Sequence, residues 1–256
     1  MTRLRVVLAG LGVRGRHWAE VLSRSPRCEI IAYADPDPAA RARTAAQYGE
    51  RPAFESAEAA LEAMPSVDAL VLANPPIGRR SQVQAAVSRG VPLLIEKPLA
   101  LNLEEAADLV ALAESASVPL MVGLNFRYLA VTKALKRLLT ENVVGRPEFA
   151  RFTYERYRDG RRPDLNKYPL TMDQPMLWEQ SIHHFDLMRF VYERAPLAVQ
   201  CQTWNPSWSM YASDANVAAI FRFEGGMVIN YQGCLLYTSD AADDLLCVDL
   251  GGRRII

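Results

Sequence analysis

The sequence lacks the features that mark membrane, secreted and zinc-ribbon proteins. None of its apolar runs approaches the length of a membrane-spanning helix, and Met1 leads into a strand-like LRVVLAG rather than a signal-peptide core. Its four cysteines lie far apart without a CxxC pair, which argues against a disulfide framework and a zinc ribbon. We therefore expect a cytoplasmic protein with reduced cysteines.

An excess of charge of one sign is also lacking. Lysine plus arginine and aspartate plus glutamate number 29 each, so bulk electrostatics favours neither nucleic acid nor an anionic membrane as a partner. A chain of 256 residues is long enough for about two domains with real cores. The expected partner is a small molecule, whose site has to be found in local motifs.

The stretch from Cys234 to Ile256 abandons the alternating strand pattern before it. Back-translated, the segments that begin at Cys234 and at Val248 both resemble a transposase-type sequencing adapter in one reading frame. We therefore expect residues 234–256 to be an adapter-derived artefact of a chain truncated near Gly233. Removing them subtracts two arginines and four aspartates, which leaves 27 basic and 25 acidic side chains and preserves the charge balance.

Residues 1–126 are predicted to form an α/β domain of the Rossmann type, with a doubly wound parallel sheet. Short aliphatic runs alternate with helical stretches, a pattern typical of parallel strands covered on both faces. Asn102 is well placed to cap the last helix. The expected strands are residues 4–10, 29–35, 68–74, 92–98 and 120–126, and the expected helices are 15–25, 38–49, 57–65, 81–90 and 102–117.

Residues 127–233 are predicted to form an α+β domain for substrate binding and oligomerisation, with a mostly antiparallel open sheet. Helices are expected at 130–142 and 176–192, and strands at 146–157, 199–204, 217–223 and 227–233. The EGG tripeptide at 224–226 predicts a hairpin turn. If the chain is truncated near Gly233, we expect its last strand to lack partner strands.

A glycine-rich turn follows the first strand. It reads Gly10-Leu11-Gly12-Val13-Arg14-Gly15 between a strand and a helix, where GxGxxG indicates close approach of a pyrophosphate to the helix amino terminus. Asp35 ends the second strand, where a carboxylate accepts hydrogen bonds from ribose hydroxyls and repels a 2′-phosphate. These residues favour NAD over NADP, although Arg41 and Arg43 leave NADP as an alternative.

Two of the three histidines, His183 and His184, are adjacent in the sequence. On a helix with about 100° per residue, Glu179, His183 and Asp186 share a sector of about 60°, whereas His184 points about 100° away. A histidine flanked by carboxylates suits proton exchange near neutral pH, while His184 is expected to be a packing or surface residue. A metal site formed by the same three side chains is an alternative, but one helix rarely closes a coordination sphere, so no metal is expected.

Another aliphatic strand ends at Glu96-Lys97-Pro98, at the edge where open α/β sheets place ligands. A partly desolvated Lys97 there can hold a substrate hydroxyl and ease its deprotonation. The triplet alone is equally compatible with an ordinary strand exit.

The order of these motifs carries a family resemblance. GxGxxG, Glu-Lys-Pro, the GLNFRY segment from Gly123 to Tyr128 and Glu179-x-x-x-His183-x-x-Asp186 follow one another along the chain. Over residues 1–233 the chain thereby resembles the glucose-fructose oxidoreductase and inositol dehydrogenase family (Gfo/Idh/MocA). It departs from that family at Glu179, where members often have aspartate, and near Arg79, where many have histidine.

The resemblance implies an NAD-dependent dehydrogenase acting on a secondary hydroxyl of a sugar, cyclitol or related polyol. It makes Lys97, His183 and Glu179 the catalytic residues, with His183 as general base or acid, and it adds Arg127 to them as a substrate-binding residue. It also implies a homo-oligomer through the open sheet. The implied cofactor-binding residues are Gly10, Gly12, Val13, Arg14, Gly15, Asp35, Asn74, Pro75, Glu96, Lys97 and Asn125.

Two other functions stay open. A nucleotide-sensing regulator of this fold would bind NAD without turnover, although it would need neither Lys97 nor His183. A reductase of a non-sugar ligand, such as a linear tetrapyrrole or a dihydrodiol, would use the same scaffold. Within the loop at 156–169, Arg158, Arg161, Arg162 and Lys167 either receive an anionic sugar acid or form a solvated charged surface.

Overall fold

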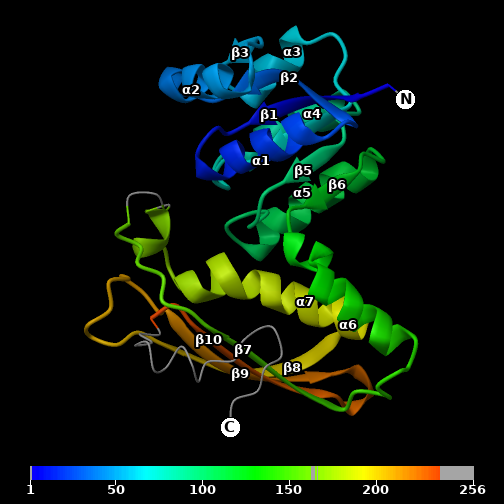
Figure 1. Cartoon of the computed structure of the whole chain (residues 1–256), viewed down its shortest axis with the longest axis vertical. Coiled ribbons are helices and arrows are strands. Elements are labelled where there is room, and N and C mark those ends of the chain that lie inside the picture. Colours follow the sequence, from blue (N-terminus) through cyan, green and yellow to red (C-terminus); the bar gives the residue numbers. More distant parts are fainter. Residues whose placement is uncertain (1, 163–164, 166, 237–256) are drawn as a thin grey trace. The chain divides into compact units, whose positions relative to one another are not determined.

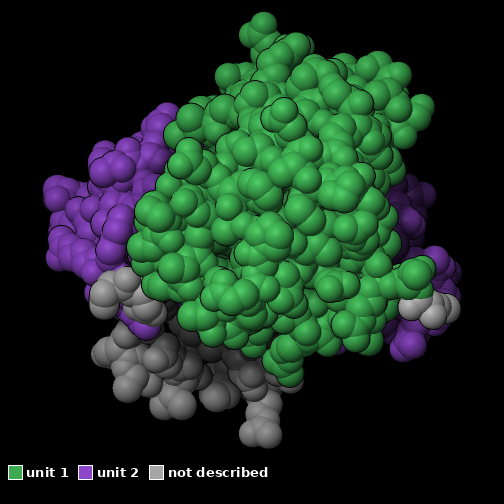
Figure 2. Space-filling view, turned by 90° about the horizontal axis from the view of Figure 1, so that it is seen from above, with its two compact units in different colours: residues 1–124 green, residues 125–256 purple. Residues whose placement is uncertain are grey.

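The computed structural model describes residues 2–162, 165 and 167–236. The chain divides into two compact units, residues 1–124 and 125–256, which Figure 2 draws in different colours. Most of the tail that we expect to be adapter-derived, residues 237–256, lies outside the described residues, so its origin stays a prediction. In the part of the chain that the structure describes, no helix is both long enough and apolar enough to cross a bilayer.

Unit 1 is built on a six-stranded parallel sheet with the order β3-β2-β1-β4-β5-β6 (Figure 1). This is the order of a doubly wound dinucleotide-binding fold, so the predicted Rossmann-type domain is confirmed. The strands are β1 (Leu4–Ala9), β2 (Cys28–Ala34), β3 (Ala53–Phe54), β4 (Ala69–Leu72), β5 (Leu93–Ile95) and β6 (Leu120–Val122). The helices are α1 (Val13–Arg24), α2 (Pro38–Tyr48), α3 (Ala57–Ala63), α4 (Arg79–Ser88) and α5 (Leu103–Ser115).

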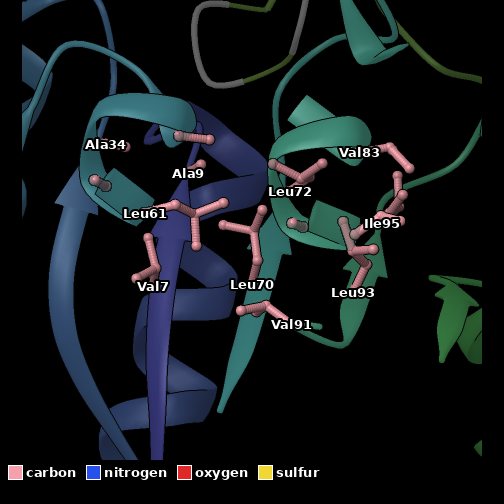
Figure 3. Packing of buried hydrophobic residues seen from close by; sticks show 14 of the residues in the cluster. Val7, Ala9, Ala34, Leu61, Leu70, Leu72, Val83, Val91, Leu93 and Ile95 are labelled. Carbon is pink, nitrogen blue, oxygen red and sulfur yellow. The ribbon is translucent and has the colours of Figure 1, made fainter. Parts of the chain in front are cut away.

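The core of unit 1 covers both faces of this sheet. Val7, Leu70 and Ile95 on one face are fully buried, and Leu61 of α3 and Val83 of α4 belong to the same cluster (Figure 3). Alternate strand residues point to the opposite face, where a second cluster forms with α1. Because helices cover both sides, the strands read as continuous apolar runs in the sequence. Asn102 caps α5 as predicted, accepting a hydrogen bond from the Glu105 N–H at 2.8 Å.

Unit 2 combines helices with a four-stranded mixed sheet of order β7-β10-β9-β8. Two of its three pairings, β8–β9 and β9–β10, are antiparallel, whereas β10 and β7 run parallel. The mostly antiparallel sheet is therefore confirmed. The strands are β7 (Phe149–Glu155), β8 (Pro196–Trp204), β9 (Asn216–Phe223) and β10 (Val228–Cys234), and the α-helices are α6 (Ala130–Thr140) and α7 (Ile182–Tyr192).

The expectation that the last strand would lack partners is wrong. β10 lies inside the sheet between β7 and β9, so the edge strands are β7 and β8. The pairing continues to Cys234, opposite Glu155 and Asn216, and the following Leu235 and Leu236 are buried. Apolar residues at this position fill the core whatever the origin of their codons, so their burial does not bear on the adapter hypothesis.

The turn between β9 and β10 is the predicted hairpin. Glu224–Gly226 form one helical turn, in which Gly225 and Gly226 have φ angles of 70° and 82°. Glycine adopts this left-handed conformation without steric penalty.

The core of unit 2 lies on one face of this sheet. Phe185 and Met188 of α7 pack there with Phe221 and Tyr231.

Four short elements differ from the expected secondary structure. The two-residue strand β3 was not expected at all. The strand expected at 120–126 ends at Val122, and Asn125–Tyr128 form a 3₁₀ turn, η1. A second 3₁₀ turn, η2, covers Tyr168–Leu170. The helix expected at 176–192 begins as a π-helix, η3 (Met176–Ser181), and becomes α-helical at Ile182.

Candidate active site

In unit 1 the predicted residues gather at one edge of the sheet. The glycine turn follows β1, Asp35 follows β2, Asn74 and Pro75 follow β4, and Glu96 and Lys97 follow β5. Because β2, β1, β4 and β5 are consecutive neighbours and run parallel, their carboxyl ends meet at the same edge. Ligands of open α/β sheets bind at this edge, beside the strand where the order reverses.

The glycine turn combines tight packing with open space. A Cβ on Gly10 would lie 2.4 Å from the Asn74 nitrogen, and one on Gly15 would lie 1.8 Å from the Gly10 carbonyl oxygen, so the turn depends on glycine at both positions. Around a Cβ on Gly12, in contrast, the described residues place no atom within 4 Å. A turn that is tightly packed at Gly10 and Gly15 and open at Gly12 fits the close approach of a pyrophosphate.

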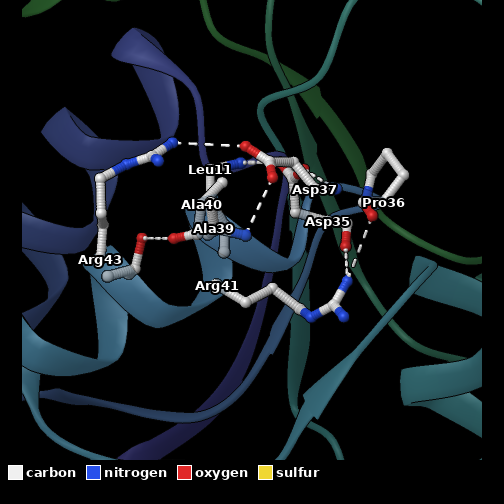
Figure 4. A network of polar contacts seen from close by, with 9 residues as sticks. Leu11, Asp35, Pro36, Asp37, Ala39, Ala40, Arg41 and Arg43 are labelled. Atoms are coloured by element: carbon white, nitrogen blue, oxygen red, sulfur yellow. Dashed lines mark hydrogen bonds and ion pairs between the residues drawn. The ribbon is translucent and has the colours of Figure 1, made fainter.

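The Asp35 carboxylate is oriented by main-chain groups. Its Oδ2 accepts a hydrogen bond from the Leu11 N–H at 2.6 Å, and its Oδ1 accepts one from the Asp37 N–H at 2.9 Å (Figure 4). Arg41 donates to the main-chain oxygens of Asp35 and Pro36, and Arg43 faces Asp37 at 3.4 Å. A carboxylate has about four acceptor positions, so Asp35 retains capacity for ribose hydroxyls.

Glu96 is buried and is held by protein donors on α1. The Arg14 Nε and the Trp18 Nε1 both donate to its Oε1, at 2.6 and 2.7 Å. A Cβ on Gly123 would lie 3.2 Å from the same oxygen, so glycine leaves room for the carboxylate. Trp18 was missed as a site residue, because its bond to Glu96 joins segments that are far apart in the sequence. Sequence reasoning assigned Glu96 to the cofactor, whereas in the structure its carboxylate accepts hydrogen bonds from Arg14 and Trp18.

Arg79 at the start of α4 was also missed as a site residue, and it is fully buried. Its guanidinium donates to the main-chain oxygen of Asn74 at 2.8 Å and to that of Glu96 at 3.3 Å, so it ties the ends of β4 and β5 together. Burial lowers the pKa of Arg79 to about 10, opposed by the charges of Glu105 and Glu96. Lys97 follows these bridged strand ends, and its peptide bond to Pro98 is cis.

In unit 2, His183 lies in the first turn of α7 and is buried. Its ring stacks on Phe126 of η1, with centroids 4.3 Å apart and planes inclined by 14°. The same 3₁₀ turn carries Asn125, which is exposed, and Arg127. The Arg127 Nε donates to Asp186 at 2.6 Å, a second guanidinium bond joins the same carboxylate, and this hydrogen bonding raises the pKa of Arg127. Arg127, predicted to bind substrate, therefore fastens η1 to α7.

Glu179 lies on the π-helix, so the wheel of about 100° per residue does not describe its position. Hydrogen bonds in a π-helix join residues five positions apart, so each residue rotates the backbone about the helix axis by a smaller angle than in an α-helix. The Glu179 carboxylate accepts hydrogen bonds from the Tyr168 hydroxyl and from Arg158, the latter at 3.4 Å. π-Helical turns occur frequently at functional sites. Sequence analysis considered Arg158 only as a ligand for an anionic substrate, and it missed Tyr168, because nothing in the sequence indicates that this loop reaches Glu179.

The structure changes the interpretation of the basic loop. Arg158, 14% exposed, forms an ion pair with Glu179, and Lys167 donates to the main-chain oxygens of Gly160 and Arg162. At least two of the four cations considered for an anionic sugar acid therefore bind the protein's own oxygens. Among the described residues, no group of three His, Cys, Asp or Glu side chains is placed to hold a metal ion.

His184 was expected to be either a packing or a surface residue, and the structure shows that it is a core residue. It is 1% exposed, its Nδ1 lies 2.8 Å from the Tyr231 hydroxyl, and its ring packs beside Phe152 and Tyr154. Burial, reinforced by the charge of His183, lowers the pKa of His184 to about 3. The imidazole is therefore neutral at physiological pH.

Comparison with known protein families gives two consecutive matches. Residues 4–124 match the model described as an oxidoreductase family with an NAD-binding Rossmann fold, and residues 132–246 match the GFO/IDH/MocA C-terminal domain. The chain is 31% identical over 193 residues to D-apiose dehydrogenase of Paraburkholderia graminis, covering 74% of the chain and 50% of that enzyme. It is 26% identical over 197 residues to inositol 2-dehydrogenase of Rhizobium meliloti, covering 77% of the chain and 57% of that enzyme.

Solved structures share the fold. An oxidoreductase from Agrobacterium radiobacter in complex with NAD+, L-tartaric acid and magnesium superposes with a TM-score of 0.87 at 22% identity, covering 94% of this chain and 69% of that one. Scyllo-inositol dehydrogenase of Lactobacillus casei, with NAD(H) and scyllo-inositol, gives 0.80 at 17% identity, covering 91% and 70%. The chain spans 50% and 59% of the length of two D-apiose dehydrogenases that it matches.

Proposed function

This chain belongs to the Gfo/Idh/MocA oxidoreductase family, and from that membership we propose that it is an NAD-dependent dehydrogenase of a sugar, cyclitol or related polyol. One observation carries the proposal: neighbouring strands of unit 1 bring an open glycine turn, Asp35 and Lys97 to the same edge of the sheet. The similarity to D-apiose and inositol dehydrogenases supports the substrate class.

The residues at this edge fit a dinucleotide. The turn from Gly10 to Gly15, with Val13 and Arg14, would hold the pyrophosphate, and Asp35 would accept hydrogen bonds from the ribose hydroxyls. NAD rather than NADP is favoured because Arg41 and Arg43 bind oxygens of their own loop, while the Asp35 charge would repel a 2′-phosphate. We also assign Asn74, Pro75 and Asn125 to cofactor binding, as the family resemblance implies. The bound dinucleotide supplies the hydride acceptor or donor.

The protein's own groups position the substrate and move its proton. Lys97 would hold the oxygen of the reacting hydroxyl, and its positive charge would favour the alkoxide over the alcohol. His183 would accept the hydroxyl proton during oxidation and return it during reduction. Its stacking on Phe126 fixes the plane of the imidazole, which is what directed proton transfer requires. Glu179, four residues before His183 in the sequence, would contact the same substrate.

The test is a polyol screen with NAD and NADP, run on this chain and on any longer product of its gene. In Lys97→Ala and His183→Ala, kcat should fall at least about 100-fold because each variant loses a charge or proton-transfer group, while the Kd for NADH in His183→Ala changes by less than about threefold. Lys133→Ala and His17→Ala, at exposed positions, serve as controls and should retain activity.

Full turnover by either Lys97→Ala or His183→Ala would contradict the assigned roles. Binding of NADH by the unmodified protein without turnover of any polyol would favour the regulatory alternative. A preference for NADPH would contradict the role given to Asp35.

A further inference from the structure

Glu96, the residue before Lys97, is hydrogen-bonded by side chains of another element, helix α1. Glu96 follows β5, is 4% exposed, and receives both hydrogen bonds to Oε1 from α1, the helix that begins at the glycine turn. Its main-chain oxygen is bound by Arg79 of α4. The position of Glu96, and with it the start of Lys97, is therefore set by two helices as well as by the sheet.

The two donors on α1 lie on one face of the helix. Arg14 and Trp18 are four residues apart, so their side chains are neighbours one turn apart. Hydrogen bonds from two neighbouring donors to a single oxygen fix the rotation of α1 relative to the end of β5. A bond from a charged donor to a buried carboxylate is among the stronger protein hydrogen bonds. The contact is thus a specific link, not a loose packing arrangement.

Arg14 also connects this link to the glycine turn. Its Nε binds Glu96, 36% of its side chain is exposed, and among the described residues its two terminal nitrogens have no acceptor. As part of GxGxxG, Arg14 lies where the proposed dinucleotide would bind. One edge of its guanidinium is therefore committed to Glu96, and the other is available to a ligand at the turn.

We propose that Glu96 is a positioning residue that couples the dinucleotide-binding end of α1 to Lys97, with Trp18 and Arg14 as its two anchors. The coupling rests on the proposed function, because it gives Lys97 and the glycine turn roles in one reaction. Glu96 need not touch the cofactor itself to influence binding. A ligand that orders Arg14 would also order Glu96, and the Glu96–Lys97 segment with it.

Two variants weaken the link in different ways. Trp18→Phe removes one donor and keeps an aromatic ring, and Glu96→Gln removes the charge and keeps an acceptor. Tyr33→Phe is the matched control, because Tyr33 is a buried residue of β2 whose hydroxyl donates to the Gly49 oxygen at 3.3 Å, apart from Glu96. The control loses one hydrogen bond of unit 1 without disturbing the link. If Glu96→Gln does not fold, Trp18→Phe carries the test.

The first readout is the rate of reductive methylation of Lys97 relative to exposed Lys133, followed by mass spectrometry without any dinucleotide. We expect a change of at least about threefold in Trp18→Phe and Glu96→Gln and none in Tyr33→Phe, because only the first two release the segment before Lys97. The second readout is the NADH Kd, expected to rise about fivefold in Glu96→Gln, a loss comparable to one net hydrogen bond.

The outcomes separate this inference from the proposed function. If Lys97 reactivity in both link variants matches that in Tyr33→Phe, Glu96 is only structural and the inference is overturned. If the unmodified protein binds no NADH although Lys97 reactivity responds to Trp18→Phe, the proposed function fails while the positioning of Lys97 by Glu96 stands.

Discussion

Adjacent histidines on α7 have different environments, and this difference determines their chemistry. His183 stacks on Phe126 of η1, whereas His184 packs among the rings of Phe126, Phe152, Tyr154 and Tyr231. The Tyr231 hydroxyl bonds both His184 and Ser181, and burial raises the pKa of Tyr231, so the tyrosine also stays neutral. A neutral, hydrogen-bonded imidazole fixes α7 against its sheet, which orients His183 one residue away.

The buried His184 predicts a pH dependence of stability. Its pKa is about 3 in the folded protein and 6.5 ordinarily, so between these values only the unfolded chain binds the proton. The full stability of the fold with neutral His184 is present above pH 6.5. Below that pH, the free energy of unfolding falls by up to about 1.4 kcal/mol per pH unit.

Urea unfolding between pH 6.5 and 5 measures this slope. His184→Gln should be less stable at pH 7 but should lose less stability on acidification, because its side chain does not titrate. His17→Gln, at an exposed histidine, should behave like the unmodified protein. Equal slopes for His184→Gln and the unmodified protein would show that His184 is not the group that titrates.

At the scale of elements, η1 and α7 are joined by two hydrogen bonds from the Arg127 guanidinium to the Asp186 carboxylate. Asp186 is 8% exposed, and Arg127 places a cation beside this buried carboxylate. We expect Arg127→Met to lower the free energy of unfolding by about 2 kcal/mol, less than the 3–5 kcal/mol of a fully buried pair because 38% of the arginine is exposed. The double variant Arg127→Met/Asp186→Leu should recover most of the loss.

The control for this cycle is the surface pair Arg80–Asp108, with side chains 64% and 61% exposed. Arg80→Met should change stability by less than about 0.5 kcal/mol. Thermal and urea unfolding measure all of these variants. If Arg127→Met instead raises KM with unchanged stability, Arg127 contacts substrate as the sequence suggested.

The sequence predicted the elements that have a repeating pattern and missed those that do not. The apolar strands of unit 1, the Asn102 cap and the glycine hairpin all depend on local residues, and all are present. β3 is two residues long and η1 four, too short for any periodicity to appear. The π-helix at 176–181 depends on packing that a uniform helical wheel ignores.

The same limit applies to the site. Residue types at strand ends indicated Asp35 and Lys97, because parallel strands bring their ends together whatever the loops do. The Glu96–Trp18 bond joins residues 78 positions apart, and the Tyr168–Glu179 bond depends on an irregular loop. Such contacts are set by tertiary structure and have no signature in a single sequence.

At the scale of the whole molecule, we propose self-association through the face of the four-stranded sheet that no described helix covers. Strand register places Phe149, Trp204 and Ile220 on the face opposite the α7 core, and they are 58%, 42% and 49% exposed. Exposed apolar side chains on one face of a sheet favour a symmetric partner.

Analytical ultracentrifugation tests this proposal. Ile220→Asp should weaken self-association at least about 30-fold, because it would bury a charge at the centre of the interface. Leu103→Asp replaces another exposed apolar residue, on α5 of unit 1, and should leave association unchanged. A monomeric unmodified protein, or an Ile220→Asp variant that associates normally, would exclude this face as the interface.

The parallel pairing of β7 with β10 also determines when the sheet of unit 2 can form during translation. All six strands of unit 1 have been synthesised once Val122 has left the ribosome, whereas β7 must wait for residues 156–227 before its neighbour exists. Until then α7 has no complete sheet on which to bury Phe185 and Met188. During translation, unit 1 can therefore close its sheet early, while unit 2 stays open until its central strand, the last described one to be synthesised, enters between β7 and β9.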